Sequence, residues 1–468
     1  MFEIQLGDIA TAVNGTLIQG EQGVIVQGIA TDSRKVKPGD LFIALRGKKF
    51  DGHHFLETAV KAGAIALLVM DEAQLMSLKL PVAIIKAADT LTAFGALARN
   101  HRRQYHIPLI AITGSNGKTT TKDLAGAVLA GCLAVVKTEA NFNNEIGLPM
   151  TLLQINHQTQ AAIVEMGMRG MGQIRQLAGI AEPNIAMITN VGLTHLELLG
   201  TQENIARAKT ELVEALPENG LAILNGDDPY VRKMQGFTRA RSVLYGIETA
   251  GLDYQAGEIK MNDYGSTFQV YFKGQTLDLS LPIPGRHNIL NAMAVVALGH
   301  ELGLPAAEIR KGLANPDLTG KRLKITEHNG YSVIDDTYNA SPASVKAALD
   351  VLVASTQRGR KIAVLADMLE LGPSETDLHR EVGVYAGSLG VDKLLAWGEL
   401  ASEYATGMND ISEGKGEYFS TKPALIEYLK QFVQPGDIIL VKGSRGMKME
   451  EVVEVLLKEE TESWRRNM

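Results

Sequence analysis

From Leu109 onward, short runs of apolar residues alternate with segments of helical periodicity. The first apolar runs are Leu109–Thr113, Ala161–Met166, Ile185–Val191 and Leu221–Leu224. Runs that are apolar at consecutive positions, rather than at alternate ones, are typical of parallel strands buried on both faces. Because parallel strands are joined by crossover helices, the pattern predicts an α/β domain with helices on both faces of its sheet.

Apolar strands also precede and follow this stretch. An earlier group lies at Val24–Ile29, Leu41–Ala44, Ala64–Met70 and Val82–Ile85, and a later group at Val333–Asp335, Lys361–Leu365, Lys393–Ala396 and Ile438–Val441. We interpret the polar, basic segment Arg99–Gln104 as a connector and place a second boundary near Asn315–Asp317. A chain of 468 residues exceeds what one hydrophobic core normally organises. We therefore predict three α/β domains, at residues 1–104, 105–317 and 318–468.

The composition argues against several functional classes. The net charge is −7 and no block of Lys and Arg stands out, so we expect no nucleic-acid partner. The longest apolar stretch, Ala64–Met70, is too short to cross a bilayer, and Met1–Val13 lacks the apolar core of a secretory signal. Cys132 alone cannot form a disulfide framework, and its apolar surroundings predict a buried structural thiol. We expect a cytoplasmic protein without membrane insertion.

A glycine-rich loop stands between the strand Leu109–Thr113 and a predicted helix. Its residues are Gly114, Ser115, Asn116, Gly117, Lys118, Thr119 and Thr120. Glycines allow backbone N–H groups to turn toward phosphate oxygens, the helix N-terminus adds a partial positive charge, and Lys118 adds a full one. The hydroxyl of Thr119 is placed to bind Mg²⁺. The loop therefore predicts a site for nucleotide phosphates.

This loop departs from the full phosphate-loop pattern at one position. Ile112 stands where the pattern G-x-x-x-x-G-K-[ST] begins with glycine. The alternative interpretation is a glycine-rich turn that carries a surface lysine. That alternative leaves the buried strand before the loop unexplained, so we favour phosphate binding.

Two further side chains follow predicted strands. Glu165 lies at the end of Ala161–Met166, and His195 follows Ile185–Val191. Ligands of open parallel sheets bind beyond the carboxyl ends of the strands, so we expect both side chains in the crevice of the phosphate loop. Together with Thr119 they are suited to divalent cations on a triphosphate. The alternatives are an ion-paired carboxylate and an ordinary loop histidine.

One lysine lies on the apolar face of a predicted helix, Thr201–Leu216. The apolar face carries Ile205, Ala208, Leu212, Val213 and Leu216, and the opposite face carries Glu203, Arg207, Glu211 and Glu214. Lys209 falls in the middle of the apolar face. A buried ammonium is unfavourable unless it is paired or neutralised. Lys209 therefore either reaches solvent along its apolar stem or is a functional group that faces the crevice.

In combination, these features resemble the Mur ligases over nearly the whole chain. The matching segments are Thr31–Arg34, Gly39–Phe42, Asp51–His53, Thr113–Lys122, Asn141–Pro149, Thr189–Val191 with His195, Gly285–Ala292, Arg322 and Asp335–Pro342. The resemblance implies three domains: a small α/β N-terminal domain that binds a UDP-sugar, a central parallel-sheet domain like a P-loop ATPase, and a C-terminal Rossmann-like domain.

The resemblance also implies roles for individual residues. Lys118 would contact the β- and γ-phosphates of ATP, with His195 and Lys209 as its catalytic partners. Thr119, Glu165 and His195 would bind Mg²⁺. Lys209 matches a lysine that the family carbamylates with CO₂, which would turn a buried ammonium into an anionic Mg²⁺ ligand. The remaining implied contacts are Asn288, Asn291, Arg322 and Asp336 for the nucleotide, and Asp32, Ser33 and Arg34 for UDP.

Several segments are typical of the branch of the family that adds D-alanyl-D-alanine to a UDP-N-acetylmuramoyl-tripeptide. They are Asp336–Pro342, Ala366–Gly372 with His379, and Val441–Gly446. In the implied reaction, the terminal carboxylate of the tripeptide attacks the γ-phosphate of ATP, and the dipeptide amine then attacks the acyl phosphate. Lys118 and two Mg²⁺ ions would stabilise the charge in both steps. We expect the chain to act as a monomer.

A ligase that adds a single amino acid, to a UDP-muramoyl-dipeptide or to a folate, is the alternative. The segment Asp32–Arg34 argues against a folate, and the lack of an Asp-Asn-Pro-Arg motif argues against diaminopimelate. A Mur-like partner of an amidotransferase would need four cysteines for zinc, and this chain has one. The chain departs from many relatives at Glu165–Gly170, where they carry a more polar Gly-Ala-Asn-His version.

Overall fold

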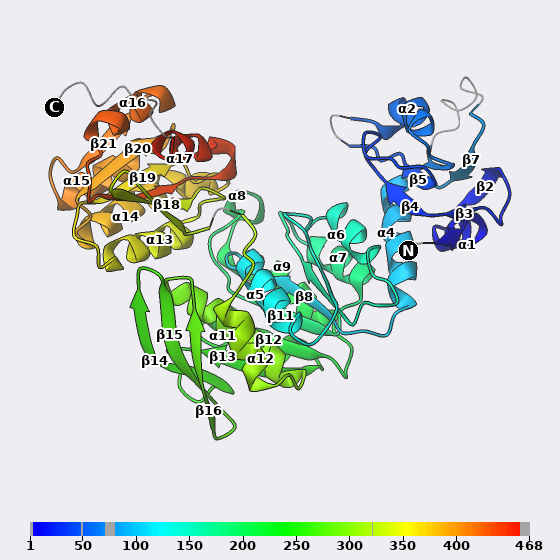
Figure 1. Ribbon diagram of the computed structural model, residues 1–468, viewed down its shortest axis with the longest axis horizontal. Coiled ribbons are helices and arrows are strands. Elements are labelled where there is room, and N and C mark those ends of the chain that lie inside the picture. Colours follow the sequence, from blue (N-terminus) through cyan, green and yellow to red (C-terminus); the bar gives the residue numbers. More distant parts are fainter. Residues whose placement is uncertain (1–2, 48–49, 71–79, 321, 459–468) are drawn as a thin grey trace.

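The computed structural model describes residues 3–47, 50–70, 80–320 and 322–458. Within these residues lie sheets of five, nine and six strands, in chain order, and a small two-stranded sheet. The five-stranded and six-stranded sheets lie toward opposite ends of the longest axis, with the nine-stranded sheet between them (Figure 1). Helices accompany every large sheet, which confirms the predicted α/β fold class.

The five-stranded sheet belongs to the N-terminal part of the chain. Its order is β2 (Thr16–Gln19), β7 (Ala83–Lys86), β6 (Ala66–Val69), β5 (Asp40–Ile43) and β4 (Gly28–Ala30). Only β2 is antiparallel to its neighbour. The short strands β1 (Ile4–Gln5) and β3 (Ile25–Val26) pair beside it, and its helices are α1 (Leu6–Ala12), α2 (Leu56–Lys61) and α4 (Thr90–Arg103).

The segment Arg99–Gln104, which we interpreted as a connector, is instead the end of helix α4. Its side chains are not all solvated, because the imidazole of His101 contacts the carbonyl of Ile155 at 2.7 Å and Arg102 donates to the carbonyl of Tyr105 at 2.7 Å. Both side chains are buried. The polar composition resembles a linker in the sequence, and only packing against the central part of the chain reveals a helix.

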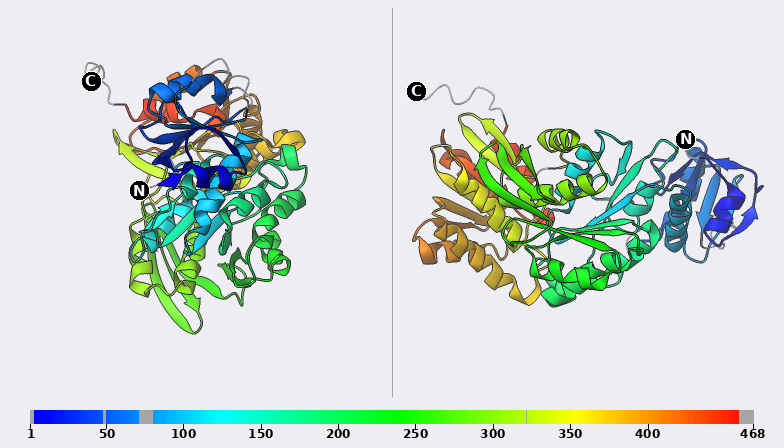
Figure 2. Two further views of the ribbon diagram at one scale, coloured as in Figure 1. Left: turned by 90° about the vertical axis from the view of Figure 1, so that its right-hand side faces the viewer. Right: turned by 90° about the horizontal axis from the view of Figure 1, so that it is seen from below.

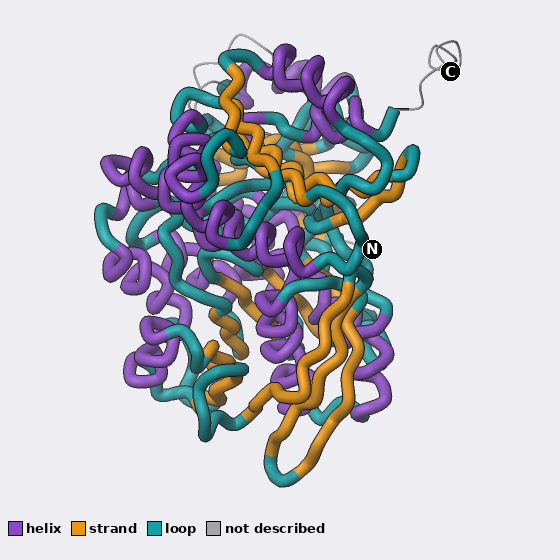
Figure 3. Tube along the Cα trace, turned by 90° about the vertical axis from the view of Figure 1, so that its left-hand side faces the viewer, coloured by secondary structure: helices purple, strands orange, loops and turns teal. Residues whose placement is uncertain are grey.

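The nine-stranded sheet carries the glycine-rich loop. Its order is β16 (Gln275–Leu281), β15 (Gly265–Phe272), β14 (Tyr254–Asn262), β13 (Arg241–Gly246), β12 (Leu221–Asn225), β11 (Ile185–Ile188), β8 (Leu109–Thr113), β10 (Ala161–Glu165) and β9 (Val135–Lys137). All neighbours from β9 to β14 pair in parallel, whereas β14, β15 and β16 pair antiparallel. The antiparallel strands form a long ribbon (Figure 3). Strand β8 lies between β10 and β11, so the ends of these three strands meet at one edge.

Helices cover both faces of the central sheet (Figure 2). Ile110 and Ile112 of β8 pack in one core with α5 (Lys118–Leu129), α11 (Arg286–Glu301) and α12 (Ala306–Ala314). Leu109 and Ala111, whose side chains alternate with these, pack in the other core. That second core includes residues of α6 (Gly147–Leu152), α7 (Gln173–Ala181), α8 (Leu196–Leu199), α9 (Gln202–Glu214), α10 (Pro229–Lys233) and the 3-10 helix η2 (Met234–Phe237).

The six-stranded sheet forms the core of the C-terminal part. Its order is β17 (Lys324–His328), β18 (Tyr331–Asp336), β22 (Ile438–Lys442), β19 (Lys361–Ala366), β20 (Lys393–Trp397) and β21 (Gly416–Phe419), and only β17 is antiparallel. One face packs on α13 (Pro342–Ala354), α14 (Glu375–Ser388) and α15 (Ser402–Ile411), and the other on α16 (Lys422–Phe432) and α17 (Glu450–Leu456). The 3-10 helices η3 (Gly372–Ser374) and η4 (Arg445–Met447) follow β19 and β22.

The prediction of a buried thiol at Cys132 is wrong, because this side chain is exposed. Helix α5 ends at Leu129, and Cys132 lies in the turn that follows. Its neighbours Leu133 and Val135 pack partly against the core, so the apolar run contributes to the core without burying its thiol. In the part of the chain that the structure describes, no helix is long and apolar enough to cross a bilayer.

Candidate functional site

The loop between β8 and α5 depends on two glycines. Gly114 and Gly117 have positive φ angles of 153° and 82°, which side chains rarely adopt. A Cβ atom on Gly114 would lie 1.9 Å from the hydroxyl oxygen of Thr189, and one on Gly117 would lie 2.4 Å from the amide oxygen of Asn291. Both positions therefore require glycine for conformation and for space.

The segment after strand β11 holds this loop in place. The backbone N–H of Ser115 donates to the carbonyl of Asn190, and the N–H of Asn116 donates to the Asn190 side chain, both at 2.9 Å. The hydroxyl of Thr189 donates to the carbonyl of Asn116 at 2.6 Å. The backbone N–H of Gly192 donates to the hydroxyl of Ser115 at 2.8 Å. The loop thus has a fixed shape that is set by the neighbouring strand.

Lys118, at the first position of helix α5, lies over the loop. Its ammonium donates to the carbonyl oxygens of Gly114 and Ser115 at 2.6 and 3.1 Å. Burial lowers the pKa of Lys118, the carboxylate of Glu165 opposes that shift, and the guanidinium of Arg322 adds to it. A cation that is held by carbonyl oxygens alone can exchange them for phosphate oxygens, which offer it full negative charge.

Thr119 and Glu165 bring two oxygen atoms together beside Lys118. The hydroxyl of Thr119 donates to Glu165 Oε2 at 2.8 Å, and the other carboxylate oxygen accepts from the amide of Asn143 at 2.8 Å. Arg322 donates to the Thr119 hydroxyl at 3.0 Å. Thr119 and Glu165 are both buried. The phosphate loop and strand β10 therefore meet as expected from the parallel sheet.

This arrangement fits Mg²⁺ better than a metal with many protein ligands. The described residues contain no group of three His, Cys, Asp or Glu side chains that could hold one metal ion. Mg²⁺ in nucleotide sites commonly takes one or two protein oxygens and completes its shell with phosphate and water. The Thr119 hydroxyl and the Glu165 carboxylate offer that kind of partial shell.

His195 and Lys209 lie within electrostatic reach of Lys118. His195, whose φ is 59°, contacts Glu370 through Nδ1 at 2.5 Å. Burial lowers the pKa of His195, Glu370 opposes the shift, and Lys118 and Lys209 contribute to it. Burial also lowers the pKa of Lys209 well below its usual value, Lys118 adds to that effect, and Asp228 opposes it. The structure therefore brings together the three residues that we predicted as catalytic.

Lys209 is 2% exposed, so its side chain does not extend into open solvent. The predicted apolar face of helix α9 is confirmed, since Ile205, Ala208 and Leu212 are buried with Lys209. The prediction for Glu211 is wrong: this carboxylate, expected on the outer face, is buried. It accepts from the backbone N–H groups of Gly172 and Arg175, at 2.8 and 3.0 Å. The start of helix α7 covers this part of α9, which the sequence of α9 alone does not reveal.

The residues predicted to contact the nucleotide surround the loop from two sides. Asn288 and Asn291 are buried on helix α11, and the amide of Asn291 donates to Asn288 at 3.3 Å. Arg322 stacks on the ring of Tyr338, with its guanidinium carbon 4.2 Å from the ring centroid. Its buried Nε has no hydrogen-bond partner among the residues that the structure describes. Thr120 is buried in the first turn of α5.

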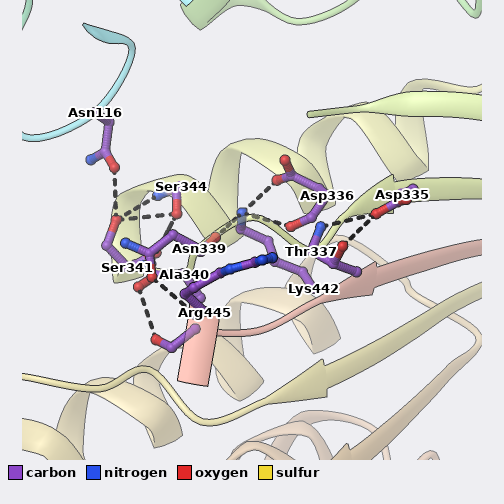
Figure 4. A network of polar contacts seen from close by, with 11 residues as sticks. Asn116, Asp335, Asp336, Thr337, Asn339, Ala340, Ser341, Ser344, Lys442 and Arg445 are labelled. Carbon is purple, nitrogen blue, oxygen red and sulfur yellow. Dashed lines mark hydrogen bonds and ion pairs between the residues drawn. The ribbon is translucent and has the colours of Figure 1, made fainter. Parts of the chain in front are cut away.

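Asp336 lies at the end of strand β18, in a polar network of the C-terminal part (Figure 4). It accepts from the ammonium of Lys442 at 2.5 Å, and Lys442 also donates to the carbonyl of Asn339 at 2.8 Å. The same network reaches the phosphate loop, because the hydroxyl of Ser341 donates to the side-chain oxygen of Asn116 at 3.1 Å. Asp336 is thus linked to the loop through the chain segment that follows it.

Asp32, Ser33 and Arg34 are not part of this cluster. They lie in the N-terminal part, which Figure 1 shows in dark blue at the far end from the C-terminal sheet. Arg34 donates to both carboxylate oxygens of Asp32, at 2.9 and 2.8 Å, and this pair lowers the pKa of Asp32 to about 2. The Arg34 side chain is 86% exposed, whereas Ser33 is buried.

The sequence did not single out three residues that the structure places at the site. Asn143 orients Glu165, Ser341 contacts Asn116, and Glu370 contacts His195. Asn143 and Ser341 lie in segments that resemble the Mur ligases, and this resemblance was the feature of the sequence that could have identified them as site residues. Glu370 also lies in such a segment, but its pairing with His195 joins positions that are far apart in the chain.

Three family models match the chain in succession: "Mur ligase family, catalytic domain" at residues 25–102, "Mur ligase middle domain" at 112–299, and "Mur ligase, glutamate ligase domain" at 321–445. The UDP-N-acetylmuramoyl-tripeptide–D-alanyl-D-alanine ligase of Bacillus subtilis (strain 168) is 38% identical to the chain, over 98% of this chain and 99% of the relative.

Two solved structures are similar as well. One is MurF from Acinetobacter baumannii, with a TM-score of 0.91 and 32% identity, covering 98% of this chain and 99% of the other. The second is MurF ligase from Thermotoga maritima in complex with ADP, with a TM-score of 0.82 and 28% identity, covering 93% and 98%. The resemblance in the sequence is therefore confirmed over the full chain, which belongs to the Mur ligase family.

Proposed function

We propose that the chain joins D-alanyl-D-alanine to a UDP-N-acetylmuramoyl-tripeptide through an acyl phosphate, with cleavage of ATP to ADP and phosphate. The observation that carries the proposal is the convergence of Lys118, Thr119, Glu165 and Arg322 at one edge of the central sheet. It supplies a phosphate site with a partial Mg²⁺ shell. The activity for which the Bacillus subtilis relative is named supplies the two substrates, and the ADP complex of the Thermotoga maritima relative supports the nucleotide.

The domains divide the work in this proposal. Residues 1–104 bind the UDP end through Asp32, Ser33 and Arg34, residues 105–317 bind the triphosphate, and residues 318–468 receive the dipeptide. Loop residues Gly114–Thr120 surround the phosphates. Asn288, Asn291, Arg322 and Asp336 hold the rest of the nucleotide. A reaction that uses ATP and a UDP-linked precursor fits the cytoplasm.

Lys118 and the buried groups around it supply the chemistry. The Lys118 ammonium exchanges its two carbonyl partners for β- and γ-phosphate oxygens and stabilises charge as phosphate is transferred. Thr119 and Glu165, with His195, hold Mg²⁺, which neutralises phosphate charge when bound. The three parts of the chain close over the substrates and exclude water, since an acyl phosphate is readily hydrolysed.

Lys209 is proposed to react with CO₂ to give a carbamate. Carbamate formation requires the neutral amine, and the buried position of Lys209 lowers its pKa and so favours that form. The neighbouring Lys118 ammonium also disfavours a second positive charge at this place. A carbamate replaces the ammonium with two oxygen atoms, which suit Mg²⁺.

Phosphate release from ATP tests the substrate assignment. The purified chain is incubated with ATP, Mg²⁺, one UDP-muramoyl peptide and one amine, over a matrix of muramoyl-dipeptide or tripeptide and single amino acids or D-alanyl-D-alanine. We expect release only with a tripeptide and D-alanyl-D-alanine, with one pentapeptide formed per phosphate. Lys118→Ala serves as the control for contaminating ATPases. Release with a muramoyl-dipeptide and one amino acid would contradict the proposal and favour the alternative ligase.

A further inference from the structure

Glu370 is a residue of the C-terminal part that reaches the centre of the site. It lies in the segment after strand β19 and has a positive φ of 64°. Its carboxylate contacts His195 Nδ1 at 2.5 Å and the guanidinium of Arg169 at 3.6 Å. Arg169 follows strand β10 and His195 follows strand β11. One carboxylate thus touches two loops that flank the phosphate loop on either side.

The backbone of the same segment is docked on the central part of the chain. The N–H of Glu197 donates to the carbonyl of Glu370 at 3.3 Å. Gly372 has a positive φ of 62°, and a Cβ atom there would lie 2.9 Å from the Cα of Glu197. Such a close approach of two backbones leaves no room for a side chain. The position of Glu370 is therefore fixed by backbone contacts of its segment as well as by the contacts of its own side chain.

We infer that Glu370 is a positioning residue for His195, and that docking of the C-terminal part prepares the histidine for Mg²⁺. The inference rests on the proposed function, because it presupposes that His195 binds the metal. A histidine that donates one ring nitrogen to a carboxylate has its other nitrogen free as a lone-pair donor, and its ring orientation is fixed. Here the carboxylate and the histidine belong to different domains, so metal binding by His195 depends on how these two domains are arranged.

Arg169 is a second partner of the Glu370 carboxylate, beside His195. Its guanidinium lies 3.6 Å from the Glu370 carboxylate and helps to hold that carboxylate between the two loops. Since the Arg169 side chain is 71% exposed, we expect its removal to matter less than the removal of Glu370.

Binding of Mn²⁺, a paramagnetic substitute for Mg²⁺, tests the inference without turnover. Mn²⁺ affinity is measured by electron paramagnetic resonance on the full chain with ADP present. We expect Glu370→Ala to weaken the binding roughly 10- to 100-fold, the usual effect of removing such a partner. Glu370→Gln keeps an oxygen acceptor for Nδ1 and should recover most of the affinity. Asp377→Ala, an exposed carboxylate of the same domain, is the matched control and should bind as the native chain does.

The variant Gly372→Val tests whether docking of the segment, and not only the presence of the Glu370 side chain, is needed for metal binding. This variant retains Glu370 but prevents the close approach to Glu197, so it should lose Mn²⁺ affinity as Glu370→Ala does. His195→Ala is measured in parallel. If His195→Ala weakens binding and Glu370→Ala does not, Glu370 has no positioning role and the metal assignment stands. If neither variant changes the affinity, His195 does not bind the metal, and both the inference and that part of the proposed function fail.

Discussion

The central part of the chain meets its two neighbours in different ways. The C-terminal part contacts it through polar pairs, most of them beside the phosphate loop, whereas the N-terminal part contacts it through helix α4, away from the loop. The pairs beside the loop are Asn116–Ser341, Thr119–Arg322, Asp123–Thr319 and His195–Glu370, and Thr356 contacts Asp263 in the turn between β14 and β15. The N-terminal contacts are Arg99 and Arg103 with Glu182, Arg102 with Asn184, and His101 with Ile155.

This difference indicates that the junction with the C-terminal part, and not the junction with the N-terminal part, belongs to the active site. At the C-terminal junction, Asn116, Thr119 and His195 belong to the site itself, so any change in the domain arrangement changes the groups that face the phosphates. At the N-terminal junction, Glu182, Arg99 and Arg103 are partly exposed and contact no residue of the candidate site. We therefore expect variants at the first junction and the loop to affect turnover, and variants at the second to affect binding or stability.

The largest effect should come from the loop that the C-terminal junction surrounds. Lys118→Ala removes the cation that faces the phosphates, and it should lower the turnover number on the order of 10²-fold or more. The melting temperature should change little, because the hydrogen bonds of the ammonium within the described part of the chain go to loop carbonyls. Lys311→Ala, an exposed lysine of helix α12, is the control. Near-native ligation by a folded Lys118→Ala variant would refute the phosphate site.

Lys209→Ala should come next and tests whether the buried lysine belongs to the same chemistry. We expect a loss of turnover on the order of 10²-fold with the fold retained, since a charge-stabilising group is removed. Added short carboxylic acids should restore part of the rate, because they can supply an oxygen to the metal. The native enzyme should slow when CO₂ is depleted and recover with bicarbonate. Full activity of Lys209→Ala would assign the lysine a packing role only.

A smaller effect is expected at the far end of the molecule. Arg34→Ala should raise KM for the UDP-peptide by about tenfold, the size of one lost charged contact, and leave KM for D-alanyl-D-alanine unchanged. Steady-state kinetics with each substrate varied in turn measures both constants. Lys37→Ala, an exposed lysine at the start of the next turn, is the control. A rise confined to the dipeptide KM would overturn the proposed division of work between the domains.

The smallest effect should appear at the N-terminal junction. Glu182→Gln removes the charge that pairs with Arg99 and Arg103, and we expect it to lower the free energy of unfolding by less than about 1 kcal/mol, as for partly exposed ion pairs. Turnover should not change. Chemical denaturation at low and high salt measures the loss, which should shrink with salt. A large drop in turnover would show that this junction also takes part in the reaction.

The glycine-rich loop and four strands of the central sheet, β8, β10, β11 and β12, were predictable from the sequence. The run Val24–Ile29, predicted as one strand, is instead divided between β3 and β4, which belong to different sheets. Consecutive apolar residues such as Leu109–Thr113 bury both faces of a parallel strand, and this local pattern does not depend on the neighbours. The glycines of the loop and the apolar face around Lys209 were also evident in the sequence, because a glycine turn and the periodicity of a helix both depend on residues that are close together in the chain. The family resemblance, which rests on short motifs, was confirmed by the comparison with known Mur ligases.

The burial of side chains by other elements and the pairing of distant residues could not be predicted from the sequence. Glu211 is buried because helix α7 lies against it, and Arg99–Arg103 are helical because the central part packs on α4. Cys132 is exposed because its turn faces away from the core. Glu370 meets His195 across two domains. Periodicity describes the faces of one element, whereas burial and pairing depend on what the rest of the chain places against each face.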